Sequence, residues 1–136
     1  MENLFVSYEQ AIALKELSFS EFCIARFSEP TKQLEYFSRP TSTMYSVNVD
    51  TPTIAQAFRW FRNVHNLHGC IDLYPSTPAH WYIRIDDITT NDYLFHSEDA
   101  DLRYDSYESA EQACLDKLIQ IVKIKDMKDS LRRNLF

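Results

Sequence analysis

The segment Thr53–Leu67, TIAQAFRWFRNVHNL, constrains the fold most strongly, because on a helix it separates into an apolar half and a polar half. At about 100° per residue its apolar side chains share one half of the circumference. They are Ile54, Ala57, Phe58, Trp60, Phe61, Val64 and Leu67. Burying each large side chain contributes about 1.5–3 kcal/mol, so this face must be covered, and a sheet is the expected cover. The segment is therefore predicted to be the central helix of the core.

The flanking residues support these helix boundaries. Thr51-Pro52-Thr53 suits a helix start, because proline fits the first turn and a threonine hydroxyl can cap free N–H groups. His68-Gly69 suits a helix end, because glycine readily takes the left-handed conformation found there. Gly69 is the only glycine in the sequence, so glycine-rich phosphate-binding motifs are absent from it.

Strand-like segments lie on both sides of the central helix. They are residues 22–27, 34–38, 44–49, 70–74, 81–86 and 93–95. A first helix is predicted from the capping box Ser7/Gln10 to about Leu17, and a last helix over 107–123. Strands that are close in sequence and joined by short turns favour antiparallel pairing. We predict an α+β fold with a mainly antiparallel sheet, about three helices packed on it, and the order α, strands, α, strands, α.

The length of 136 residues predicts one domain, which we place at 1–123. Residues 124–136 are predicted to be a C-terminal helical extension or tail. Apolar residues keep helical spacing there at Ile124, at Met127 or Lys128, at Leu131 and at Leu135. The charged residues of this stretch are mostly basic.

Composition excludes several classes of function. No apolar run approaches the ~20 residues of a membrane span, and the N-terminus is acidic, so we expect a cytoplasmic protein without membrane contact. The net charge of −6 argues against nucleic-acid binding, although the basic C-terminal stretch leaves it as a weak alternative. The three cysteines are scattered without a CxxC pair, which argues against a disulfide framework or zinc site. No cofactor is predicted.

Three segments, in the same order, resemble a group of short uncharacterised proteins encoded by gut Bacteroidetes and their phages or prophages. The segments are FVSYEQAIALKELSF, QAFRWFRNVHNLH and YESAEQACLDKLIQIVK. The chain departs from that pattern at Ser18, where the group tends to have glycine, and at Ser109, where it tends to have glutamate. Without that glutamate, no reciprocal capping box is expected at the last helix. The resemblance implies a small accessory protein of a mobile element acting in the bacterial cytoplasm, and it supplies no catalytic residues.

Two surfaces are candidates for binding. Arg59, Arg62, Asn63 and Asn66 form the polar face of the central helix, which could bind a partner of opposite charge or be simply solvated. The last helix has an apolar arc wider than one buried face needs. We predict that its flank carrying Leu115, Ile119 and Val122 forms a homodimer interface.

The histidines offer an alternative chemistry. His65 and His68 are three residues apart and could bind a metal together with His80 or a carboxylate. His80 with Asp86 or Asp87 could form an acid–base pair. Because His65 falls in the apolar arc, we predict a structural histidine there and no metal site.

Two classes of function therefore follow from the sequence. We predict a small non-enzymatic accessory or binding protein that acts through protein–protein contacts with an unidentified partner. The alternative is a small hydrolase or nuclease-like enzyme that uses histidine and carboxylate residues. A pocket that gathers histidines with carboxylates would favour the enzyme, and an exposed apolar patch would favour the binding protein.

Overall fold

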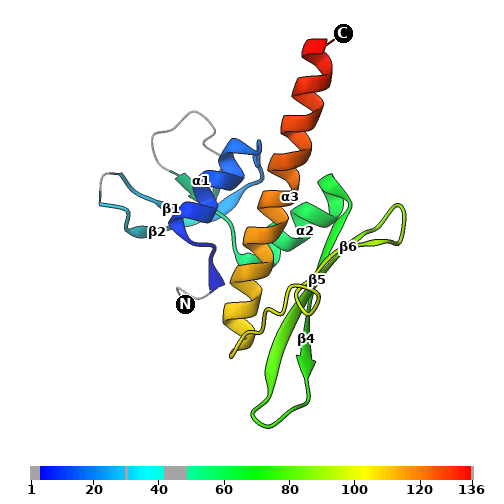
Figure 1. The fold of residues 1–136 in the computed structure, drawn as a ribbon. Helices are drawn as coiled ribbons and strands as arrows, with labels where there is room; N and C mark the ends of the chain where they lie inside the picture. The colour runs from blue at the N-terminus through cyan, green and yellow to red at the C-terminus, as the bar shows by residue number, and fades with distance from the viewer. Residues whose placement is uncertain (1–3, 30, 42–48, 136) are drawn as a thin grey trace. The chain divides into compact units, whose positions relative to one another are not determined.

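The computed structural model describes residues 4–29, 31–41 and 49–135, and within them it confirms the predicted α+β class. Three helices and two three-stranded antiparallel sheets follow the order α, three strands, α, three strands, α in these ranges (Figure 1). The strands form two sheets because the strands before the middle helix pair with one another, as do those after it. The strand predicted at 44–49 lies, except for its last residue, outside the described residues.

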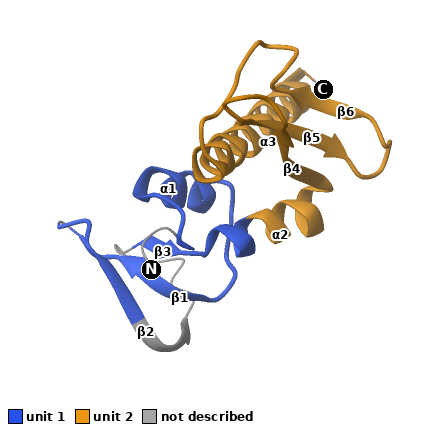
Figure 2. Cartoon of the chain, turned by 90° about the horizontal axis from the view of Figure 1, so that it is seen from below, with its two compact units in different colours: residues 1–57 blue, residues 58–136 orange. Residues whose placement is uncertain are grey.

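The chain divides into two compact units, Met1–Ala57 and Phe58–Phe136 (Figure 2), and the boundary falls within the middle helix. The first unit carries a sheet in the order β2-β1-β3. Its elements are α1 (Tyr8–Glu16), β1 (Cys23–Phe27), β2 (Leu34–Thr41) and β3 (Val49–Thr51). Helix α1 contacts β3, and the N–H of Val6 donates to the carbonyl of Pro52 at 3.2 Å. The segment before α1 is thereby held beside the end of β3.

Local sequence determines both ends of α1. The predicted capping box is present: Ser7 Oγ accepts from the N–H of Gln10 at 3.1 Å, and Gln10 Oε1 accepts from the N–H of Ser7 at 2.9 Å. After the helix, Ser18 has a φ of 70°, the left-handed conformation that glycine usually supplies. The N–H of Phe19 then donates to the carbonyl of Leu14 at 2.9 Å. Ser18 therefore ends the helix at the position where the resemblance leads us to expect glycine.

Replacing Ser18 with glycine should stabilise the protein. A residue with a Cβ is strained at this φ, and glycine relieves that strain while costing some entropy in the unfolded chain. We expect Ser18→Gly to raise the free energy of unfolding by about 0.5–1 kcal/mol, measured by urea denaturation. A loss of stability instead would show that Ser18 does not hold a left-handed conformation in solution.

The second unit carries a sheet in the order β4-β5-β6. Its elements are most of α2 (Ile54–His65), β4 (Leu67–Tyr74), β5 (His80–Asp87), β6 (Tyr93–His96) and α3 (Tyr107–Leu135). The register of the β4–β5 hairpin runs from Leu67 opposite Asp87 to Tyr74 opposite His80. Buried Ile83 and Ile85 of β5 lie on one face of this sheet, which packs against α3.

The end of α2 differs from the prediction. The helix stops at His65, and Asn66 takes the left-handed conformation at φ 55°, so the predicted stop at Gly69 is wrong. Asparagine can replace glycine at such a position because its short polar side chain tolerates it. Leu67, expected on the helix, is instead the buried first residue of β4. The rest of the predicted apolar face is buried except Val64, which is 55% exposed.

Gly69 has a packing role within β4. A Cβ at this position would lie 2.7 Å from Cε1 of Phe58, 2.8 Å from Sγ of Cys114 and 3.2 Å from Cδ1 of Leu118. These three side chains come from α2 and α3. The glycine therefore allows both helices to approach the strand more closely than any other residue would permit.

Adding a methyl group at this point should overpack the core. We expect Gly69→Ala to lower the free energy of unfolding by about 1–3 kcal/mol, because the ring of Phe58 and the sulfur of Cys114 must move. Cys70→Ala on the same strand is a matched control. Cys70 is only half-buried, so this substitution should lower the free energy of unfolding by less than Gly69→Ala does. Equal stability of Gly69→Ala and the wild type would contradict this packing.

Helix α3 begins at a serine cap. Ser106 Oγ accepts from the N–H of Ser109 at 3.0 Å, and Ser109 Oγ accepts from the N–H of Ser106 at 3.3 Å. The expectation that Ser109 removes the reciprocal cap is therefore wrong, because its hydroxyl takes the place of a glutamate carboxylate. The helix then continues without interruption to Leu135.

Candidate functional site

The predicted polar face of α2 is only partly a helix surface. Arg59 and Asn63 are exposed and Arg62 is half-buried on α2. Asn66 lies beyond the helix, and its carbonyl accepts from the N–H of Ile88 at 2.9 Å. Asn66 is therefore a turn residue between α2 and β4, and binding through the three helical residues stays a prediction.

The predicted homodimer flank is buried. Leu115, Ile119 and Val122 lie on α3 together with the equally buried Ala110, Cys114 and Leu118. The sequence predicted that this flank would be partly exposed, and the burial removes that reason for placing a second copy there. The homodimer itself stays a prediction.

The histidines do not gather at one place. His65 packs against the rings of Trp60 and Phe61 at centroid distances of 4.7 and 5.9 Å, and burial lowers its pKa. His80 stacks on Tyr74, and its Nδ1 lies 2.9 Å from Ser76 Oγ. Within the described residues, no group of three histidine, cysteine, aspartate or glutamate side chains could hold a metal ion.

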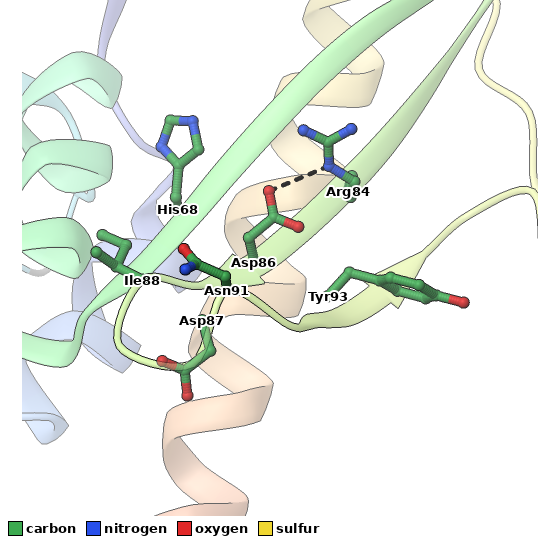
Figure 3. A pocket seen from close by; sticks show the side chains of 7 residues that line it. All are labelled: His68, Arg84, Asp86, Asp87, Ile88, Asn91 and Tyr93. Carbon is green, nitrogen blue, oxygen red and sulfur yellow. Dashed lines mark hydrogen bonds and ion pairs between the residues drawn. The ribbon is translucent and has the colours of Figure 1, made fainter.

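His68 lines an open pocket of about 460 Å³ (Figure 3). The other lining residues are Arg84, Asp86, Asp87, Ile88, Asn91 and Tyr93. Cross-strand pairing places His68 opposite Asp86. His80 lies six residues before Asp86 along β5, about 20 Å away at strand spacing, so the alternative of an acid–base pair of His80 with Asp86 or Asp87 does not form. Sequence patterns missed the pair of His68 and Asp86, because it depends on the hairpin register.

Both carboxylates of this pocket already have partners. Arg84 Nε donates to Asp86 Oδ2 at 3.1 Å, and this hydrogen bond raises the pKa of Arg84. Figure 3 marks the contact with a dashed line. Asp87 Oδ1 accepts from the N–H of Thr89 at 2.9 Å and from the Thr89 hydroxyl, which lowers the pKa of Asp87. Asp87 therefore stabilises its own turn and stays ionised, and Asp86 is held by a cation.

The cysteines carry no activated thiol. Cys23 and Cys114 are buried, and burial raises the pKa of each to about 12. Burial also raises the pKa of Cys70, against the opposing effect of Arg84. Because the thiolate is the nucleophilic form, the raised pKa values keep these thiols mostly in the less reactive protonated form near pH 7.

Four apolar side chains are exposed at the end of α3. Ile124, Met127, Leu131 and Leu135 are 45%, 66%, 62% and 78% exposed. Their spacing of three and four residues places them on one face of the helix, and we call this face the α3 stripe. Figure 1 shows this end of α3 extending beyond the sheet of its own unit. The spacing was visible in the sequence, but its exposure was not.

A shallow groove of about 400 Å³ runs along one edge of the α3 stripe. It is lined by Ile121, Ile124, Lys125, Lys128, Asp129 and Arg132. Three of these six side chains are cationic and one is anionic. The apolar stripe is therefore bordered by a predominantly basic edge.

Comparison of the chain with protein-family models, with known proteins and with solved structures finds no match. The described residues contain no helix with both the length and the apolar composition needed to cross a lipid bilayer. The site must therefore be interpreted from its own chemistry, and the α3 stripe is the strongest candidate for a binding surface.

Proposed function

We propose that this chain is a small accessory protein that acts through protein–protein contacts rather than by catalysis. The observation that supports this proposal is the α3 stripe, an exposed apolar face on a regular helix. Exposed apolar surface beyond what scattered residues provide marks interaction sites on soluble proteins. A helix with apolar residues at intervals of three and four is also a common means of docking into a groove or against another helix.

The proposed setting follows from the resemblance of the three sequence segments. We propose that the protein belongs to a mobile element of gut Bacteroidetes and works in the bacterial cytoplasm. An accessory protein of this kind would bind a component of the host or of the element itself. The stripe supplies the apolar contact for that binding, and the charges of the basic edge beside it orient the partner.

One matched pair of substitutions tests this proposal. Leu131→Glu places a charge in the middle of the stripe, whereas Ser130→Glu adds the same charge to an exposed neighbour off the stripe. Both variants should keep the helical circular dichroism of the wild type. We expect proteins retained from a Bacteroidetes lysate by immobilised wild type and Ser130→Glu to be lost with Leu131→Glu.

Retention of the same proteins by Leu131→Glu would contradict the proposal. Light scattering on the purified chain shows whether the stripe is covered by a second copy of this chain or is left for a different protein. A dimer that dissociates in Leu131→Glu would show that a second copy covers the stripe, and a monomer leaves the stripe free for a different protein.

A further inference from the structure

We propose that the α3 stripe binds an acidic amphipathic helix of another protein. This inference rests on the proposed function, because it specifies the chemistry of the partner at the same surface. Two features of the stripe support this inference, namely its geometry and the sign of the charges along its basic edge.

The geometry fits a helix. The stripe runs from Ile124 to Leu135 along 12 residues, which is about 18 Å at the rise of an α-helix. Ile124 and Leu131 are seven residues apart, and Met127 and Leu135 each lie four residues from Leu131. Side chains at such intervals form a nearly straight seam that packs against a similar seam on a neighbouring helix.

The charges favour an acidic partner. Residues 123–135 carry five cationic and two anionic side chains, a net charge of +3 within a chain of net charge −6. By the 100° rule, Lys128, Arg132 and Lys125 follow one another directly beside the apolar stripe, whereas Asp126 lies on the opposite side of the helix. Asp129 also lines the groove, and by the same rule it lies farther from the stripe than these three cations. A partner helix with glutamate or aspartate flanking its apolar seam therefore meets cations along this edge.

The same charges disfavour a second copy. If two α3 ends paired in antiparallel orientation, the edge that carries Lys125, Lys128 and Arg132 would meet its own equivalent. Like charges across a helix–helix contact are destabilising. The stripe is thus better suited to a different chain than to an antiparallel copy of itself.

Two synthetic peptides test the inference with the full-length protein. Both are 21 residues long and carry leucine at the seam positions; one has glutamate at the flanking positions, and the other has lysine. Fluorescence anisotropy at low and physiological salt measures their affinities. We expect the glutamate peptide to bind at least about 30-fold more tightly than the lysine peptide, with the difference shrinking as salt rises.

A charge-reversal variant provides the decisive control. Lys125→Glu combined with Lys128→Glu and Arg132→Glu changes only exposed side chains, so its circular dichroism should match that of the wild type. We expect this variant to prefer the lysine peptide. Leu131→Glu should weaken binding of the favoured peptide by about 30-fold or more, because it disrupts the seam that both peptides need.

Equal binding of the two peptides, or an unchanged preference in the charge-reversal variant, would overturn the inference. Tighter binding to vesicles of phosphatidylglycerol and phosphatidylcholine, or to a fluorescent oligothymidylate, would overturn it in favour of a lipid surface or a nucleic acid. If the glutamate peptide does not bind but Leu131→Glu still abolishes retention of lysate proteins, the proposed function stands and only the acidic chemistry of the partner is wrong. If the glutamate peptide does not bind and Leu131→Glu retains the same lysate proteins as the wild type, the proposed function is wrong as well.

Discussion

The second unit depends on the close approach of two helices to one strand. Phe58 of α2 and Cys114 and Leu118 of α3 all lie against the backbone of β4 at Gly69, where no Cβ occupies the space. This contact sets how near α3 lies to the sheet, and so determines which of its residues become core. From Ala110 to Val122 the inward side chains are buried, and after Val122 every described side chain of the helix is exposed. The division of α3 into a packed part and an exposed part follows from this arrangement.

Much of the fold could be predicted from the sequence, because periodicity records which face of an element is buried. Five of the seven residues predicted for the apolar arc of α2 are buried on that helix, and the predicted capping box of α1 is present. The left-handed positions were harder, since Asn66 and Ser18 adopt a conformation that the sequence rules assign first to glycine. Gly69 was consequently misread as a helix stop, although its lack of a side chain serves packing.

The candidate site was less predictable, because it depends on register and exposure. Periodicity cannot show that His68 rather than His80 lies opposite Asp86, since one must know where the hairpin turns. The seam of Ile124, Leu131 and Leu135 could be read from spacing alone. Whether such a seam is buried or exposed depends on how far the sheet extends beneath the helix. The local spacing of apolar residues does not reveal the extent of the sheet. The flank with Leu115 illustrates the same limit, because a wide apolar arc suggested exposure where the chain buries it.

We propose that one continuous helix, α3, is structural at its start and available for binding at its end. Two leucines on α3 test it most directly, because Leu118 is fully buried and Leu131 is 62% exposed. Urea denaturation of Leu118→Ala should show a loss of about 2–5 kcal/mol in the free energy of unfolding. Leu131→Ala should change it by no more than about 0.5 kcal/mol. Comparable losses in the two variants would mean that the end of α3 belongs to the core, and would contradict the assignment of the α3 stripe as a binding surface.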